Sequence, residues 1–183
     1  MTSTTIWHVT MSLDGFITGP DDDTIGWTAG YGGVGPMADE VARTTGAILA
    51  GRRWHDVATA KYDGRAGIYG GHYTGRVLVL THTPPADPPD PEIVFVSGSI
   101  EDAVAKAHEA ANGKRVGIFG ANVAGQVIAA GLLDEIVAHV VPVLLGDGVR
   151  LYGSGAADPT VRLERIDATL SPQITDLRFR VIR

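Results

Sequence analysis

One stretch of the sequence decides the fold: Lys114-Arg115-Val116-Gly117-Ile118-Phe119-Gly120-Ala121-Asn122-Val123-Ala124-Gly125. Its apolar run from Val116 to Phe119 is short and rich in β-favouring residues, which predicts a buried strand. Gly120 follows at once, and apolar residues then recur at helical spacing up to Gly131, where a helix would end. A strand, a glycine turn and a helix in this order suit a phosphate, although many ordinary strand–helix turns also contain glycine.

The same succession of short apolar runs and helical segments extends to both sides of this stretch. Strands are predicted at Thr4–Met11, Ala47–Ala50, Arg76–Thr81, Ile93–Val96 and Glu135–Leu145, and helices at Met37–Thr45 and between Ser99 and Gly113. Pro142 falls inside the last of these strands and predicts a bulge or an edge position there. Two runs of alternating apolar residues around Ser171-Pro172 predict a final antiparallel hairpin.

The length of 183 residues favours one domain over residues 1–183 with a sizeable core. The net charge of -6 argues against nucleic acid or an anionic membrane as the main partner. The absence of cysteine excludes disulfides, a thiolate nucleophile and a cysteine-based zinc site. The chain starts without a signal-peptide pattern and has no apolar run that would span a bilayer, so we expect a cytoplasmic protein.

Several kinds of chemistry find no support in the sequence. The six histidines are scattered without ligand spacing, so no metal site is predicted. No P-loop pattern is present, and Gly153-Ser154-Gly155 lacks the frame of a hydrolase nucleophile elbow. The glycines of the central stretch do not have the G-x-G-x-x-G spacing of a standard dinucleotide fingerprint.

Three predicted strands nevertheless end in residues that suit a phosphate. These ends are Gly51-Arg52-Arg53, Thr81-His82-Thr83 and Gly120-Ala121-Asn122-Val123. Arginine offers a rigid fork of donors to phosphate oxygens, although an exposed arginine pair is as often simply solvated. Because ligands of open α/β sheets gather at the carboxyl ends of the strands, the three ends together favour a phosphorylated dinucleotide.

Several motifs, in order, resemble the dihydrofolate reductase-like superfamily. They are Thr10-Met11-Ser12-Leu13-Asp14-Gly15-Phe16-Ile17-Thr18-Gly19, Gly51-Arg52-Arg53-Trp54, Gly120-Ala121-Asn122, Gly131-Leu132-Leu133-Asp134-Glu135 and Val141-Pro142-Val143-Leu144-Leu145-Gly146-Asp147-Gly148. The resemblance covers nearly the whole chain. It is strongest to the branch related to the C-terminal reductase domain of the bacterial riboflavin-biosynthesis deaminase/reductase.

The resemblance implies a three-layer α/β/α fold whose mixed, mostly parallel sheet ends in antiparallel strands. It further implies that NADPH lies across the strand ends and passes a hydride to a C=N or C=O bond of a small heterocyclic or carbonyl substrate, pterin-like or ribitylaminopyrimidine-like. The residues that it assigns to the cofactor are Thr10, Ile17, Gly51, Arg52, Arg53, Trp54, Thr81, His82, Gly120, Ala121, Asn122, Val123 and Ala124. The family usually has a second glycine where this chain has Ala121.

A proton donor for such a reduction is sought among the carboxylates. True dihydrofolate reductases use one early in the first helix, and here Asp39 and Glu40 are the out-of-register candidates. Asp14 is a third, although it would also suit a bond to its own turn. Two other classes stay open: a nucleotide-binding module without turnover, and a flavin or deazaflavin protein using the same strand ends. Relatives of this branch are often dimers, so a homodimer is expected.

Overall fold

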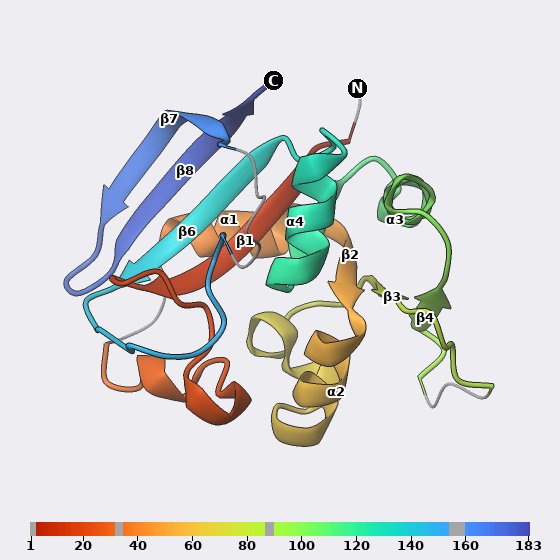
Figure 1. Cartoon of the computed structure of the whole chain (residues 1–183), viewed down its shortest axis with the longest axis horizontal. Coiled ribbons are helices and arrows are strands. Elements are labelled where there is room, and N and C mark those ends of the chain that lie inside the picture. Colours follow the sequence, from red (N-terminus) through yellow and green to blue (C-terminus); the bar gives the residue numbers. More distant parts are fainter. Residues whose placement is uncertain (1–2, 32–34, 87–89, 154–159) are drawn as a thin grey trace.

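The structure is a computed structural model that describes residues 3–31, 35–86, 90–153 and 160–183. Within these ranges the strands form one eight-stranded sheet in the order β4-β3-β2-β5-β1-β6-β8-β7 (Figure 1). The strands are β1 (Thr5–Ser12), β2 (Thr45–Gly51), β3 (Arg76–Leu80), β4 (Ile93–Val96), β5 (Arg115–Phe119), β6 (Glu135–Val141), β7 (Arg162–Leu170) and β8 (Thr175–Ile182). The helices are α1 (Pro36–Thr44), α2 (Arg52–Lys61), α3 (Ile100–Ala111) and α4 (Ala121–Ala129), with 3₁₀ turns η1 (Pro20–Asp22), η2 (Gly26–Thr28) and η3 (Gly64–Gly71).

Strand direction divides the sheet into two parts. From β4 to β6 all neighbouring strands are parallel, whereas β8 is antiparallel to both β6 and β7. The stretch Lys114–Gly125 forms β5, the glycine turn and the first part of α4, and β5 lies between β2 and β1. The predicted mixed, mostly parallel sheet with C-terminal antiparallel strands is confirmed.

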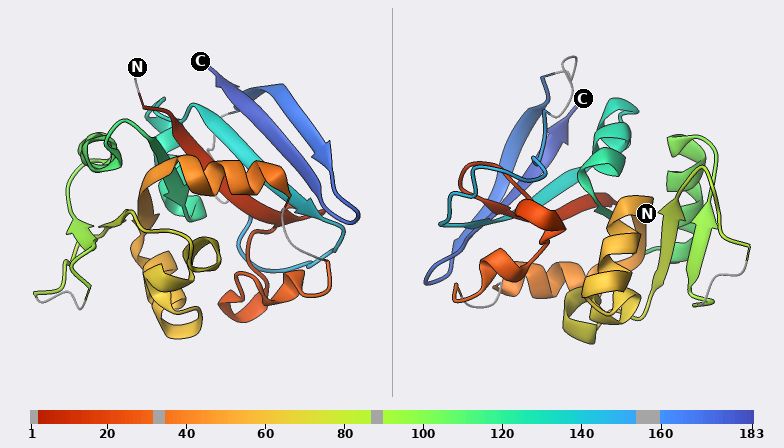
Figure 2. Two further views of the ribbon diagram at one scale, coloured as in Figure 1. Left: turned by 180° about the vertical axis from the view of Figure 1, so that it is seen from behind. Right: turned by 60° about the horizontal axis from the view of Figure 1, so that its bottom comes forward.

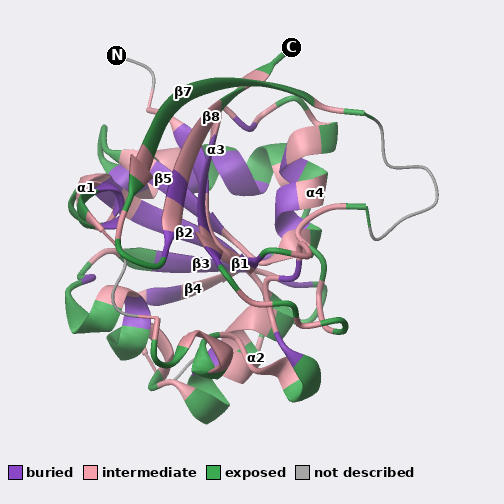
Figure 3. Cartoon of the chain, turned by 90° about the vertical axis from the view of Figure 1, so that its left-hand side faces the viewer, coloured by how far each residue is buried: buried purple, intermediate pink, exposed green. Residues whose placement is uncertain are grey.

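Helices cover both faces of the sheet. The helices α3 and α4 pack on one face, and α1 and η3 pack on the other, as the front and back views show (Figures 1 and 2). Alternation along β2 explains how one strand serves both layers, because Ala47 and Leu49 face α3 and α4 while Ile48 and Ala50 face η3. These four side chains are fully buried, and the central strands carry most of the buried residues (Figure 3).

The prediction of a strand through Leu145 is wrong at its C-terminal end. The strand β6 ends at Val141, and Pro142 follows it in the chain instead of forming a bulge inside it. The reason is the position of β6 between β1 and β8, where both edges of the strand take part in ladders. Proline has no N–H to give to such a ladder, so the pairing stops before it.

The hairpin of β7 and β8 closes the sheet and leaves one strand exposed. Nearly every residue of β7 is exposed, as is visible along its length in Figure 3. Three of its aliphatic side chains, Leu163, Ile166 and Leu170, are among the exposed large apolar residues. Within the described ranges, the helices are too short or too polar to cross a membrane.

Candidate functional site

A cavity of about 800 Å³ opens at the carboxyl ends of the central parallel strands. The ends of β2, β3 and β5 contribute Gly51, Thr81 and Gly120 to its wall, and β1 contributes the side of the strand around Thr10. Parts of η1 and η3 complete the lining. The cavity therefore lies where ligands of open α/β sheets bind, at the edge that the sequence analysis singled out.

Two helices begin at this cavity without a side-chain cap. Gly51 precedes α2 and Gly120 precedes α4, and neither supplies a capping hydrogen bond to the first turn of its helix. The helix α3, by contrast, is capped in the usual way because the Ser99 hydroxyl accepts the Asp102 N–H at 3.1 Å. Since β2 and β5 are neighbours, the two uncapped ends lie side by side and offer their first-turn N–H groups to one anion.

The two arginines after β2 hold different positions around the cavity. Arg52 pairs with Asp56 one turn later and donates to the Thr83 carbonyl oxygen at 3.3 Å, which ties α2 to the loop after β3. Arg53 is more exposed and reaches across to Asp22 of η1, with 2.6 Å between Nη2 and Oδ1. Asp22, from the acidic segment Asp21-Asp22-Asp23, also lines the cavity.

The residues that the resemblance assigned to the cofactor gather at the cavity with one exception. Its lining includes Thr10, Ile17, Gly51, Arg52, Arg53, Trp54, Thr81, His82, Gly120, Ala121, Asn122 and Val123. Ala124 lies beneath the lining, fully buried in the core between α4 and the sheet. Its N–H donates to the Gly120 carbonyl oxygen at 3.1 Å and so belongs to the first turn of the helix.

Asp14, proposed from the sequence as a proton donor, serves the turn after β1. Its carboxylate accepts the Ser12 hydroxyl at 2.6 Å and the backbone N–H groups of Leu145 and Gly146 at 3.1 and 2.8 Å. The Ser12 hydroxyl, together with these N–H groups and against the opposing effect of burial, lowers the pKa of Asp14 to about 2. A carboxylate that is ionised at neutral pH and committed to a turn is poorly suited to give up a proton.

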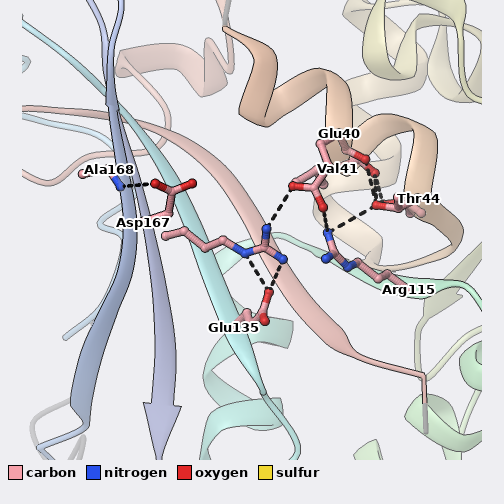
Figure 4. Close-up of polar contacts among 9 residues, drawn as sticks. Glu40, Val41, Thr44, Arg115, Glu135, Asp167 and Ala168 are labelled. Carbon is pink, nitrogen blue, oxygen red and sulfur yellow. Dashed lines mark hydrogen bonds and ion pairs between the residues drawn. The ribbon is translucent and has the colours of Figure 1, made fainter. Parts of the chain in front are cut away.

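The two acidic residues of α1 also lie outside the cavity lining. Asp39 is exposed in the first turn of the helix, where a carboxylate complements the helix dipole. Glu40 bridges two arginines, with Oε1 at 2.7 Å from Arg115 and Oε2 at 2.9 Å from Arg178. Figure 4 shows Glu40 beside Arg115, and Arg178 in turn binds Glu135 of β6 at 2.7 Å. Glu40 therefore joins α1 to strands β5 and β8.

Replacing Glu40 with glutamine should lower the free energy of unfolding by about 1–3 kcal/mol, because two partly buried guanidinium groups each lose an ionic partner. Chemical denaturation measures this loss. The matched control is Glu164→Gln, since Glu164 pairs with Arg180 in an exposed position. That variant should lose at most about 1 kcal/mol. Equal losses in the two variants would show that the Glu40 network contributes no more than a surface pair.

A chain of four polar side chains at the cavity is absent from the sequence-based predictions. The Tyr69 hydroxyl lies 3.2 Å from Nδ1 of His8, and Nε2 of His8 lies 2.6 Å from Nε2 of His139. The other nitrogen of His139, Nδ1, lies 2.6 Å from Oδ1 of Asp176. Tyr69, His8 and His139 line the cavity, while His139 and Asp176 are almost completely buried. The two imidazole rings are nearly perpendicular, at 79°, and their Nε2 atoms are within hydrogen-bond distance.

The signal for this chain in the sequence is weak. His8 lies between Trp7 and Val9 in β1, and His139 lies between Ala138 and Val140 in β6, and a buried polar ring needs a partner. The partners come from η3 and β8, and no local pattern indicates that these elements meet. Tyr73, which lies near Tyr69, belongs to the core, since it is buried and its hydroxyl donates to the Arg76 carbonyl oxygen at 2.7 Å.

The fold and the position of the cavity define the chain as a dihydrofolate reductase-like α/β protein. Residues 3–174 match the family model of the RibD C-terminal domain, and the chain belongs to this family. This membership supports a role of the pyrimidine reductase type. No curated protein matches the chain.

Solved structures share the fold at low sequence identity. A protein from Shewanella sp. PV-4 whose name assigns it to riboflavin biosynthesis has a TM-score of 0.81 at 21% identity, over 98% of this chain and 99% of that one. A pyrimidine reductase-like protein from Corynebacterium diphtheriae has 0.66 at 15%, over 99% and 92%. The Thermotoga maritima diaminohydroxyphosphoribosylaminopyrimidine deaminase/5-amino-6-(5-phosphoribosylamino)uracil reductase has 0.68 at 15%, over 99% of this chain but only 57% of that one.

Proposed function

We propose that the protein is an NADPH-dependent reductase that transfers a hydride to a C=N or C=O bond of a small heterocycle. One observation carries this proposal: two uncapped helix N-termini and two arginines converge on one cavity at the carboxyl edge of the sheet. Helix N-termini favour a diphosphate, and arginines favour a phosphate monoester, so together they match the two phosphate groups of NADPH. Membership of the RibD C-terminal domain family supports the reductase activity.

The close approach of the two helix starts supports a diphosphate between them. A Cβ at Gly51 would come within 3.2 Å of Val123 Cγ2, so a side chain there would crowd the space between the two helix ends. Gly51 and Gly120 would hold the diphosphate, and Arg52 and Arg53 would hold the 2′-phosphate. The bound nicotinamide would supply the hydride. The chain's own task is to orient the two reactants and to exclude water from them.

We further propose an aminopyrimidine as the substrate. The name of the Thermotoga maritima protein gives 5-amino-6-(5-phosphoribosylamino)uracil as the compound that its reductase acts on. A flat heterocycle of this kind suits the aromatic wall of the cavity, where the Trp54 and Phe119 rings meet edge to face at 5.0 Å and Tyr69 lies next to Phe119. This compound is therefore the first to test.

The binding test is a fluorescence titration of the protein with NADPH and, separately, with NADH. We expect NADPH to bind more tightly, because NADH lacks the 2′-phosphate. Arg52→Ala or Arg53→Ala should raise the NADPH dissociation constant by about 10- to 100-fold, which corresponds to the loss of one charged hydrogen-bonding group. The variant that changes NADPH binding but leaves NADH binding alone identifies the arginine at the 2′-phosphate.

The control for this titration is Arg180→Ala. Arg180 is an exposed arginine of β8 paired with Glu164, so its removal changes the net charge equally but leaves the cavity intact. Its dissociation constants should match those of the wild-type protein. Binding of neither nucleotide would contradict the proposal, and equal binding of NADPH and NADH together with tight flavin binding would favour a flavin or deazaflavin protein. Nucleotide binding without reduction of any aminopyrimidine, pterin or carbonyl compound would favour a binding module.

The expected homodimer is part of this proposal. The exposed Leu163, Ile166 and Leu170 of β7 are side chains that a second copy would cover. Sedimentation of the wild-type protein checks the oligomeric state.

A further inference from the structure

The four side chains Tyr69, His8, His139 and Asp176 connect the cavity to a buried carboxylate. They come from four elements, η3, β1, β6 and β8, and each is within hydrogen-bond distance of the next. The three carboxylates considered from the sequence lie outside the cavity lining. Reduction needs a proton as well as a hydride, and these four side chains are candidates to supply that proton.

We propose that Tyr69, His8, His139 and Asp176 form a proton relay, in which the two histidines share one extra proton that leaves through the Tyr69 hydroxyl to the substrate. This inference rests on the proposed reductase function and deepens it. Tyr69 would be the catalytic residue, since it faces the space where the substrate binds. The two histidines and Asp176 would position Tyr69 and return a proton to its oxygen.

With Asp176 a carboxylate and His8 neutral, as its lowered pKa requires, the hydrogen bonds allow two proton arrangements. In the discharged arrangement, His139 donates Nδ1–H to Asp176, His8 donates Nε2–H to His139, and Tyr69 donates O–H to Nδ1 of His8. In the charged arrangement, His139 carries protons on both nitrogens and donates to Asp176 and to His8. His8 then donates Nδ1–H to the Tyr69 oxygen, and the tyrosine O–H is free to point into the cavity.

Discharge releases one proton from the relay to the substrate and keeps each of the three hydrogen bonds. The Tyr69 O–H bond breaks as a substrate nitrogen or oxygen takes the proton. Tyr69 takes the Nδ1 proton of His8, and His8 takes the Nε2 proton of His139. The histidine pair thereby loses one positive charge, and one proton from solvent restores it. The two electrons and the hydrogen that arrive on the substrate carbon come from the reduced nicotinamide of the proposed function.

The surroundings support one extra proton on the pair, held next to Asp176. Burial, and then the charge of His139, lower the pKa of His8 to about 3, so the pair does not take a second proton near neutral pH. Burial holds the pKa of the Tyr69 hydroxyl above its usual range, so the phenol keeps its proton until a base withdraws it. Asp176 is completely buried, and its Oδ2 lies close to Gly35, the residue that precedes α1.

Four charged side chains on the packed elements are engaged with one another. Glu40 of α1 binds Arg115 of β5 and Arg178 of β8, and Arg178 also binds Glu135 of β6. Among the described residues, none donates a hydrogen bond to the second carboxylate oxygen of Asp176, Oδ2. The carboxylate is thus directed to a single ring nitrogen, which fixes the tautomer of His139.

The backbone of Tyr69 is a second, independent sign of a functional role. Its φ of 50° and ψ of 41° lie in the left-handed region, which a bulky residue rarely adopts. The two following glycines, Gly70 and Gly71, also have positive φ. A tight left-handed turn aims the tyrosine at His8, where the two rings lie 5.5 Å apart. Strain of this kind concentrates at functional sites.

The first test uses the protein without cofactor or substrate. Nitrogen-15 NMR of the imidazole rings, assigned with His8→Gln and His139→Gln, reports which ring nitrogens carry protons as the pH changes. We expect His139 protonated at Nδ1 and His8 at Nε2 at high pH. On acidification both rings should change at one common midpoint with uptake of one proton, and the proton of His8 should switch to Nδ1.

Asp176→Asn should lower this common midpoint by at least one pH unit, a tenfold loss of proton affinity, because the charge beside His139 is gone. His55 lies outside the relay, and its Nδ1 is 3.1 Å from the Thr59 hydroxyl. It reports whether the fold is intact and should titrate as in the wild-type protein. Independent midpoints for His8 and His139, or a His8 tautomer that stays constant with pH, would overturn the relay.

The second test is the reduction of 5-amino-6-(5-phosphoribosylamino)uracil by NADPH in Tyr69→Phe and Tyr73→Phe. Tyr73 lies beside Tyr69 but its hydroxyl binds backbone, so it is the matched control. We expect kcat to fall at least 100-fold in Tyr69→Phe and less than threefold in Tyr73→Phe, with the NADPH dissociation constant unchanged in both. The wild-type kcat should decline as the pH rises through the NMR midpoint. An unchanged kcat in Tyr69→Phe contradicts the relay. If the wild-type protein does not bind NADPH, the proposed function is contradicted, and the NMR experiment alone decides whether the relay exists.

Discussion

Replacing Leu49 with alanine should lower the free energy of unfolding by about 2–5 kcal/mol. Leu49 lies in β2, fully buried in the core cluster that α3 and α4 cover. Its register partners are Leu78 on β3 and Ile118 on β5, so three aliphatic side chains stand side by side across the middle of the sheet. Removal of the central one leaves a cavity that strands paired on both sides cannot close. Urea denaturation measures the loss.

The control for this prediction is the same substitution on the hairpin. Leu170 at the end of β7 is 80% exposed, and its truncation removes little apolar surface from contact. Leu170→Ala should change the free energy of unfolding by no more than about 0.5 kcal/mol in the monomer. Comparable losses in the two variants would mean that the sheet does not bury Leu49 as described.

Replacing Gly120 with alanine should weaken NADPH binding at least tenfold and lower the free energy of unfolding by about 1–3 kcal/mol. Gly120 has a φ of 92° and a ψ of 134°, a conformation that essentially only glycine adopts. A side chain would force the turn to change, and the first-turn N–H groups of α4 would move with it. The nucleotide titration and urea denaturation measure the two effects separately.

The other end of the same helix provides the control. Gly131 follows α4, has a φ of 68° and would meet nothing within 4 Å if it gained a Cβ. Gly131→Ala should therefore cost about 1 kcal/mol of stability through the backbone alone. Its NADPH affinity should stay at the wild-type value. If both variants lost affinity equally, the effect would come from a general loosening of α4 and not from the glycine turn.

The strands and the edge that carries the cavity could be predicted from local sequence. Short apolar runs such as Val77–Leu80 and Val116–Phe119 have the length and residue types of buried parallel strands. Parallel strands bring their carboxyl ends to one edge, so the loops after β2, β3 and β5 were expected to meet there. These loops line one cavity, since strands of the same direction end at the same edge of the sheet.

The relay and the Glu40 network could not be predicted in the same way. His8 and His139 are 131 positions apart, and their contact depends on the pairing of β1 with β6. Asp176 joins them only because β8 returns antiparallel to β6 with this residue opposite His139. Likewise, the local sequence only places Glu40 in the first turns of a helix. The packing of α1 on β5 and β8 is what brings its two arginine partners to it. Strand order is a global property, so local patterns do not reveal these contacts.

The most direct test of the central claim is a map of backbone amide NMR shifts on addition of NADPH to the wild-type protein. If NADPH binds in the cavity at the carboxyl edge, the largest changes should fall on Gly51–Arg53 and Gly120–Val123, where the two uncapped helices begin. The amides of β7, on the far edge of the sheet, should stay unchanged. Changes concentrated outside this cavity, or no changes at saturating NADPH, would contradict the account.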